Sequence, residues 1–307
     1  MNRVISRAKG TAKQLFLRTV GPTLVASEFK RARARLLGER GTIRVQCRTH
    51  GIHEVSPLTP EEQELVRSVS LNVHPFDSMY VLGQADHYLL VGLSAIRCIE
   101  AVLGSANISN IGIKKILDFP VGYGRVLRFL KARYSQARIS GAEIDLSAMK
   151  FCIEQFSVEA VTAPHDFSLL STPDKFDLIW CGSLITHLNE ISAFALLHLF
   201  RDHLAENGVC VFSAHGRTSA EWIRQEKCTY GLTLPERQKM LRQYEQSGYG
   251  FGEYPHVPGY GISLASPDRM RELISQLGTC IFFRSTSWDH HHDIYGFQKS
   301  VNSHLQG

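Results

Sequence analysis

The stretch Ile116-Leu-Asp-Phe-Pro-Val-Gly-Tyr-Gly-Arg125 decides the fold of this chain. An apolar run ends at Asp118, two glycines follow, and a helical pattern begins at Arg125. In open α/β sheets, ligands bind beyond the carboxyl ends of the strands, and the first strand-to-helix turn is the usual place. Gly122 and Gly124 have no Cβ, so a ligand can approach their backbone closely. The stretch therefore predicts a ligand-binding turn at the edge of a parallel sheet.

Short apolar strands and amphipathic helices alternate from residue 113 onward. The expected strands cover 115–119, 138–142, 158–161, 176–181, 209–212, 280–283 and 294–297. The expected helices cover 125–131, 147–156, 191–204 and 267–277. This alternation indicates a sheet covered by helices on both faces, so the predicted fold class is α/β, doubly wound and mostly parallel.

Two regions precede this core, and one interrupts it. Residues 1–45 predict a basic N-terminal helical arm, and residues 46–112 predict a helical cap. The core spans 113–300. Within it, residues 217–260 insert a helical stretch and a Gly/Tyr-rich substrate loop, which we expect to be exposed.

The basic charge of the chain is concentrated in the arm. Residues 1–49 hold twelve lysines and arginines against two glutamates, a net charge of +10, so the rest carries −5 of the total of +5. An acidic body argues against nucleic acid as a partner. A basic amphipathic arm can lie on an anionic membrane surface, although a helix that covers the main domain is the favoured interpretation.

The composition is that of a globular protein. Hydrophobic residues make up 44% and charged residues 21%, and no apolar run approaches the roughly 18 residues of a membrane span. Seven cysteines without a C-x-x-C pair indicate a reduced compartment, so we expect a cytoplasmic protein with possible contact to a membrane periphery through the arm.

Acidic residues follow the next two strands. Glu143 stands 19 residues after Gly124, where a carboxylate can accept hydrogen bonds from both hydroxyls of a ribose. Asp145 is placed to cap the next helix. Asp166 could accept from an adenine amino group with Phe167 against the ring, or it could be a turn residue.

Two classes of cofactor compete for this turn. Dinucleotide-binding proteins use G-x-G-x-x-G, but counting from Gly122 the third position is Leu127, so that fingerprint fails. A pyrophosphate also disfavours an acid such as Asp118 beside the loop. A cationic sulfonium ligand with an ammonium group does not.

With these elements in order, the chain resembles the class I S-adenosylmethionine-dependent methyltransferases. The resemblance rests on residues 118–124, Glu143, Asp166, the stretch 176–188 and the run 204–212, and it covers about 113–216 and, less closely, 260–299. The family pattern has glycine where Pro120 stands. Proline has no N–H, so one backbone contact to the cofactor differs.

The resemblance implies S-adenosylmethionine as cofactor and a seven-stranded Rossmann-like sheet whose last strand is inserted antiparallel. It also implies a set of cofactor-binding positions, in which Asp118, Gly122 and Gly124 surround the methionine part, Glu143 holds the ribose and Asp166 holds the adenine amine. These positions are Asp118, Pro120, Gly122, Gly124, Glu143, Ile144, Asp166, Phe167, Cys181, Gly182, Leu184 and His187.

Methyl transfer is an in-line displacement, for which the protein mainly supplies alignment. An oxygen acceptor also needs a group that removes its proton, usually a histidine or a carboxylate. The predicted catalytic residues are His215, because it stands where a strand ends, and His291 and Asp289 in the final hairpin. We predict no metal, although His290 and His292 could pair, or Asp289, His291 and Asp293.

The leading hypothesis is O-methylation of a small-molecule or glycan-type hydroxyl. Trp288, Tyr249, Phe251, Tyr254 and Tyr260 could line the acceptor pocket, or they could merely pack the inserted loop onto the body. The alternatives are an interaction protein that keeps the fold without catalysis, and a nicotinamide-dependent reductase, which Leu127 argues against.

Overall fold

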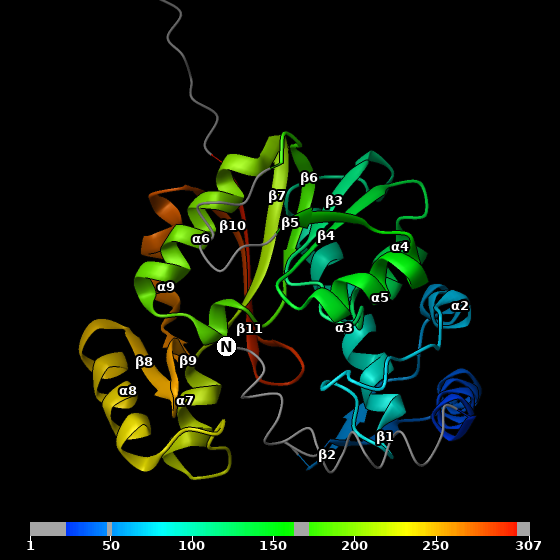
Figure 1. Cartoon of the computed structure of the whole chain (residues 1–307), viewed down its shortest axis with the longest axis horizontal. Coiled ribbons are helices and arrows are strands. Elements are labelled where there is room, and N and C mark those ends of the chain that lie inside the picture. Colours follow the sequence, from blue (N-terminus) through cyan, green and yellow to red (C-terminus); the bar gives the residue numbers. More distant parts are fainter. Residues whose placement is uncertain (1–22, 48–50, 163–171, 300–307) are drawn as a thin grey trace, which may run out of the picture. The chain divides into compact units, whose positions relative to one another are not determined.

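The computed structural model describes residues 23–47, 51–162 and 172–299 (Figure 1). The chain divides into two compact units, each assembled from stretches that are separate in sequence. The first unit comprises Met1–Arg97, Val121–Gln136 and Glu143–Ala160. The second comprises Cys98–Pro120, Ala137–Ala142 and Val161–Gly307.

A seven-stranded sheet dominates the second unit, in the order β10-β11-β7-β6-β3-β4-β5. Its strands are β3 (Lys115–Asp118), β4 (Arg138–Glu143), β5 (Glu159–Thr162), β6 (Phe176–Cys181), β7 (Leu204–His215), β10 (Gly278–Trp288) and β11 (His292–Lys299). Strands β4, β3, β6 and β7 pair in parallel, whereas β11 runs antiparallel between β10 and β7. The predicted doubly wound α/β fold and its inserted antiparallel strand are confirmed.

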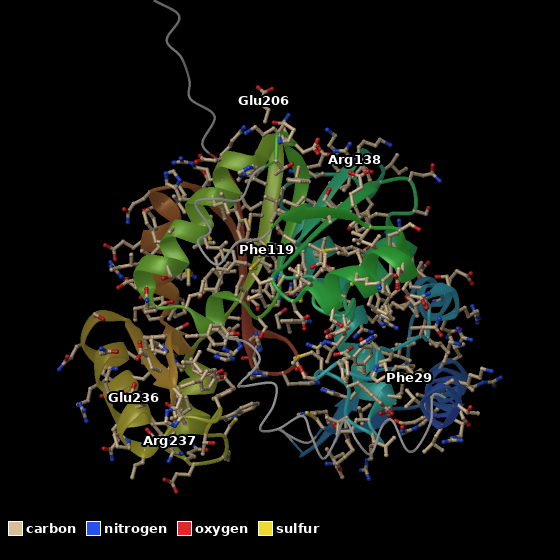
Figure 2. All side chains as sticks on the ribbon, viewed as in Figure 1. Phe29, Phe119, Arg138, Glu206, Glu236 and Arg237 are labelled. Atoms are coloured by element: carbon tan, nitrogen blue, oxygen red, sulfur yellow. The ribbon has the colours of Figure 1, made fainter. Side chains whose placement is uncertain are left out.

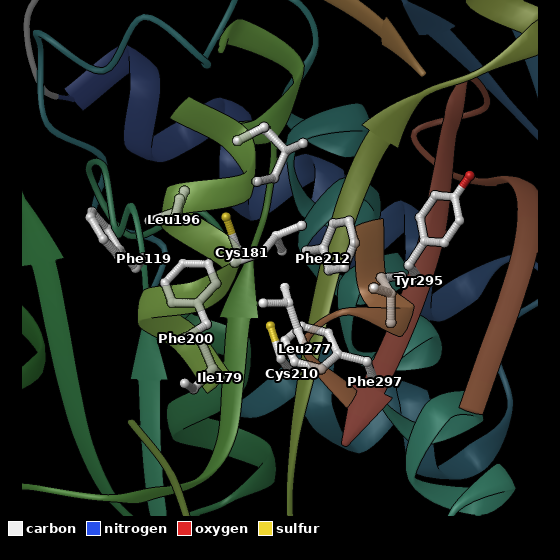
Figure 3. Packing of buried hydrophobic residues seen from close by; sticks show 14 of the residues in the cluster. Phe119, Ile179, Cys181, Leu196, Phe200, Cys210, Phe212, Leu277, Tyr295 and Phe297 are labelled. Carbon is white, nitrogen blue, oxygen red and sulfur yellow. The ribbon is translucent and has the colours of Figure 1, made fainter. Parts of the chain in front are cut away.

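Helices α6 (Glu190–His203) and α9 (Pro267–Ser275) cover one face of this sheet. Their apolar side chains pack on alternate residues of β6, β7 and β11, and Figure 3 shows this layer around Cys181, Phe200 and Phe212. The other face is covered by the end of α3 (Ala85–Ser105), because a Cβ on Gly296 would lie 2.3 Å from Val102. The neighbours Tyr295 and Phe297 point into the α6–α9 layer, as the period of two requires.

The two edges of the sheet differ in what they carry. Arg138, which begins β4, and Glu206, near the beginning of β7, lie at the amino edge, while Phe119 lies inside the molecule just after β3 (Figure 2). The carboxyl edge of the second unit is formed by the residues that follow Asp118, Cys181 and His215.

The first unit is not a purely helical cap. A helix over residues 23–38 is followed by a hairpin of β1 (Ile43–Cys47) and β2 (Gly51–Val55), then by α2 (Pro60–Ser68) and the first part of α3. The region 46–112, which the sequence analysis names a helical cap, thus also contains a strand at Gly51–Val55. Ile43, Val45 and Cys47 are buried and alternate with exposed residues, which is the period of a strand. The unit is completed by α4 (Leu127–Arg133) and α5 (Leu146–Phe156).

Helix α3 is long and apolar enough to cross a membrane by length and composition alone. However, 67% of its most hydrophobic window is buried inside the protein. Leu89, Ile99 and Val102 are among its fully buried side chains. Such burial is typical of the core helix of a globular fold.

The inserted region contains a correction to the sequence analysis. Residues 247–260 were expected to be an exposed loop, but they belong to a hairpin of β8 (Tyr249–Tyr254) and β9 (Val257–Ala265) that packs on α7 (Arg217–Arg224) and α8 (Leu234–Ser247). A Cβ on Gly250 would lie 2.0 Å from the carbonyl oxygen of Met240. The glycines are therefore there to let a strand approach a helix, and not to make a loop flexible.

Candidate active site

The glycine loop of the first unit is held by Glu143. The Glu143 Oε2 accepts a hydrogen bond from the Gly122 N–H at 2.9 Å, and Oε1 accepts from the N–H groups of Ile144 and Asp145 at 2.8 and 3.0 Å. Gly122 has φ of +50°, and nothing lies within 4 Å of the place where a Cβ would be. The side of Gly122 on which a Cβ would lie is therefore open.

The Glu143 carboxylate is partly withdrawn from solvent. Burial raises its pKa above the ordinary value, although the three backbone N–H groups act in the opposite direction. These donors occupy three of about four acceptor positions that a carboxylate offers. The remaining position, at the carboxyl end of β4, suits a ribose hydroxyl, so the residues present fit the nucleoside part of S-adenosylmethionine.

Other residues of the first unit close onto this loop. Gly124 has φ of +78°, and a Cβ there would lie 2.5 Å from the ring of Phe156. Tyr123 stacks on His74 with ring centroids 4.7 Å apart, and its hydroxyl donates to Asp145. Asp145 also caps α5, as predicted. Sequence reasoning missed His74, because no pattern connected it with residues fifty positions later.

A buried arginine donates a hydrogen bond to the glycine loop. Arg128 is 1% exposed, and its Nε donates to the carbonyl oxygen of Gly124 at 3.0 Å. Its other nitrogens donate to the Ser70 carbonyl at 2.7 Å and to the Tyr88 hydroxyl at 3.3 Å. Tyr88 in turn donates to Asp77 at 2.7 Å. Arg128 therefore fixes the glycine loop to the N-terminal part of its own unit.

The second unit presents the remaining predicted positions at strand ends. Asp118 ends β3 and is 1% exposed, and Pro120 is half-buried two residues later. Cys181 is fully buried at the end of β6, and burial raises the pKa of its thiol well above the usual range. Gly182 lies against Trp288, because a Cβ there would be 2.9 Å from that indole, and Leu184 is half-buried.

His187 ends the short helix η3 (Ile185–His187) and faces the β8–β9 hairpin. Its Nδ1 lies 2.7 Å from the carbonyl oxygen of Gly261, and its ring stacks on Tyr260 with centroids 5.0 Å apart. A carbonyl can only accept, so Nδ1 carries the proton and Nε2 of the neutral ring is a proton acceptor. Burial lowers the pKa of this imidazole, which keeps it neutral.

The predicted catalytic residues of the last hairpin lie elsewhere in the second unit. His215 and His291 are 3% and 6% exposed, and their rings lie 5.4 Å apart. Asp289 is half-buried in the β10–β11 turn with φ of +47°, and its carbonyl oxygen faces Nδ1 of His291 at 2.6 Å. The structure thus brings His215 and His291 together, and His292 joins them.

The remaining predictions are placed as follows. Ile144 is exposed in the first unit, next to Glu143. Asp166 and Phe167 lie outside the described residues. Of the expected acceptor aromatics, Tyr249 is buried and donates to the Leu188 carbonyl at 3.0 Å, so it packs the hairpin onto the body. Tyr254 and Tyr260 lie beside His187.

Residues 116–208 match the family model described as a methyltransferase domain. A search of curated proteins returned no match. Solved structures that resemble the chain include a S-adenosylmethionine-dependent methyltransferase from Clostridium acetobutylicum, with 12% identity over 68% of this chain and 92% of that chain, and a TM-score of 0.48.

Two further solved structures have similar TM-scores to this chain. Human N-acetylserotonin methyltransferase in complex with S-adenosylmethionine is 14% identical over 70% of this chain and 53% of its own, with a TM-score of 0.46. A glycopeptide N-methyltransferase complexed with S-adenosylhomocysteine is 16% identical over 67% of this chain and 86% of its own, with a TM-score of 0.45.

The sheet order, with one antiparallel strand next to the edge, defines a Rossmann-like methyltransferase fold. The matched domain falls on the strands and turns that carry Asp118, the glycine loop and Glu143. The chain therefore contains a methyltransferase domain, the domain that the resemblance to class I S-adenosylmethionine-dependent methyltransferases predicts.

Proposed function

We propose that this chain uses S-adenosylmethionine to methylate a hydroxyl oxygen of a small molecule or a glycan, with His187 as the general base. The observation that carries the proposal is the neutral imidazole of His187. Its Nδ1 faces the Gly261 carbonyl, so Nε2 is left as the basic nitrogen. Tyr254 and Tyr260 beside it offer flat apolar faces with polar tips, which suit a sugar ring or an aromatic alcohol.

The chemistry needs one proton acceptor. S-adenosylmethionine supplies an electrophilic methyl carbon on a sulfonium. The acceptor oxygen forms a bond to that carbon while the carbon–sulfur bond breaks, and the sulfur keeps the electron pair. The hydroxyl proton passes to Nε2 of His187. His187 is the proposed base in place of His215, because His215 is only 3% exposed whereas His187 is half-buried.

The experiment combines an acceptor panel with a matched pair of variants. Methyl transfer from labelled S-adenosylmethionine is measured with sugar alcohols, phenols and amines. His187→Gln keeps a donor for the Gly261 carbonyl but has no basic nitrogen, so kcat with the best alcohol should fall about 10²- to 10⁴-fold. The exposed His198 on α6 is the control, and His198→Gln should leave kcat unchanged.

The pH dependence gives a second readout. Because burial lowers the pKa of His187, the acid limb of kcat should lie below the ordinary range of histidine. Activity falls only when the pH drops through that lowered pKa. Turnover of amines but not alcohols, or an unchanged kcat in His187→Gln, would contradict the proposal.

A further inference from the structure

Three histidines meet inside the second unit. One ligand nitrogen from each of His215, His291 and His292 lies within 4.8 Å of the others, and the three residues are 3%, 6% and 4% exposed. We propose that they form a binding site for a first-row divalent transition-metal ion, with Zn²⁺ as the natural candidate. This site is separate from the proposed role of His187 in methyl transfer.

The fold itself brings the three rings together. His215 ends β7, and it is the direct cross-strand partner of His292, the first residue of β11. His291 precedes His292 in the tight β10–β11 turn, where Asp289 and His290 have φ of +47° and +60°. The ring centroids of His215 and His291 each lie within 5 Å of His292, at 4.7 and 4.1 Å. The cluster therefore depends on strand register, which is strongly specified in a buried sheet.

The outer contacts of the cluster are those that metal-binding histidines make. Nδ1 of His291 faces the Asp289 carbonyl oxygen at 2.6 Å, and Nδ1 of His292 faces the Ser213 hydroxyl at 3.1 Å. Contacts of this kind to one ring nitrogen are typical of metal-binding histidines, whose tautomer and ring orientation they fix. The same Ser213 hydroxyl accepts from the Ser183 N–H at 2.8 Å, so the cluster is connected to the turn after β6.

The surroundings of the cluster are aromatic, and a small closure of the rings gives the geometry that zinc needs. Trp222 stacks on His291 with centroids 5.4 Å apart, and Tyr230 packs against His215 at 4.7 Å. Zn–N bonds of about 2.0–2.1 Å place ligand nitrogens roughly 3.4 Å apart, so the rings need to close by about 1.4 Å at most. Among the described residues, no fourth histidine, cysteine or carboxylate belongs to the group. An oxygen ligand, water or substrate, completes the tetrahedron.

The test uses the full chain without an affinity tag, stripped with a chelator and titrated with Co²⁺. Cobalt gives visible absorption in a tetrahedral nitrogen site, and Zn²⁺ should displace it. We expect one equivalent to bind with micromolar or tighter affinity. Saturating Zn²⁺ should raise Tm by about 5 °C. Absence of stoichiometric binding to the wild-type chain overturns the proposal, whatever the variants do.

Two asparagine variants in one turn make the assignment specific. His292→Asn removes a predicted ligand, and the cobalt band and the zinc-induced rise in Tm should both be lost. His290→Asn is the matched control, because His290 is exposed, lies in the same turn, and has a positive φ that asparagine tolerates. Equal binding by both variants would overturn the proposal. If His292→Asn fails to fold, His291→Asn, which lies outside the strands, replaces it.

Discussion

At the scale of single residues, two largely buried charged side chains make the hydrogen bonds that hold the glycine loop. Glu143 accepts from three backbone N–H groups, and Arg128 donates to two carbonyl oxygens and a tyrosine hydroxyl. Both residues fix the same glycine loop from within the first unit. Substitution of Glu143 should therefore mainly weaken ligand binding, and substitution of Arg128 should mainly lower the free energy of unfolding.

The pH dependence of ribose binding tests Glu143. 5′-Methylthioadenosine has the ribose of the cofactor but not its amino acid, so its affinity isolates this contact. Because burial raises the pKa of Glu143, the affinity should fall on acidification at a higher pH than an ordinary glutamate would give. The same shift means that the unliganded fold gains stability from this group as pH falls through the raised pKa, and loses it as pH rises.

Calorimetry at a series of pH values measures both effects. Glu143→Gln should weaken 5′-methylthioadenosine at neutral pH and remove the acid limb. Asp118→Asn is the matched control, because the methionine part predicted for Asp118 is absent from this probe. If Glu143→Gln binds the probe as the wild type does, the ribose assignment is wrong.

Arg128 tests the support of the glycine loop. Arg128→Met leaves the Gly124 and Ser70 carbonyls and the Tyr88 hydroxyl without their donor, so the free energy of unfolding should fall by about 3 kcal/mol. Arg133 ends the same helix and is exposed, and Arg133→Met should change it by less than about 0.5 kcal/mol. Chemical denaturation compares the two, and equal losses would show that the buried contacts contribute nothing specific.

At the scale of elements, glycine positions decide how the β8–β9 hairpin packs. A Cβ on Gly250 would lie 2.0 Å from a backbone oxygen of α8, which cannot move like a side chain. Gly250→Ala should therefore cost about 1–3 kcal/mol of stability. Gly104 in α3 has nothing within 4 Å, so Gly104→Ala should be neutral or stabilise by up to about 1 kcal/mol.

Thermal unfolding of the two alanine variants provides the measurement. Activity with the best acceptor should fall further in Gly250→Ala than stability alone explains, because β9 carries Tyr260 and Gly261 against His187. A Gly250→Ala protein as stable as the wild type would mean that the hairpin does not need this close approach.

At the scale of the whole molecule, the predicted core of residues 113–300 contains parts of both compact units. Helices α4 and α5 belong to the first unit, whose other part precedes residue 98. A fragment of residues 113–299 lacks Ser70, Tyr88 and His74. It also lacks Gly92, where a Cβ would lie 2.4 Å from the Phe129 ring. We expect it to keep far-ultraviolet circular dichroism but to lose the near-ultraviolet signal and bind a hydrophobic dye.

The full chain is the reference for this comparison. It should show a sharp thermal transition that shifts upward with S-adenosylhomocysteine, and the fragment should show neither. A fragment with native near-ultraviolet signal and unchanged ligand affinity would show that residues 23–112 are dispensable for the fold.

The local pattern of the sequence determined the sheet and the class of chemistry. Both ends of strand β6 were predicted correctly, and Asp118 and Glu143 stand at strand ends as expected. Such features can be predicted because an apolar strand and the acid that ends it are recognised from a few neighbouring residues. The hairpins β1–β2 and β8–β9 were missed. In the second, glycines that serve close packing have the same composition as glycines in a loop, and only the neighbouring helix distinguishes them.

Only the tertiary structure decided which distant residues meet. The pairing of His215 with His292 follows from the register of two strands that are 77 positions apart. The neutral tautomer of His187 depends on a carbonyl oxygen 74 residues later. Local sequence fixes what each side chain can do, because conformational preference and polarity are properties of a few residues. Burial and hydrogen-bond partners, which set pKa and coordination, arise from packing between segments that the sequence does not place together.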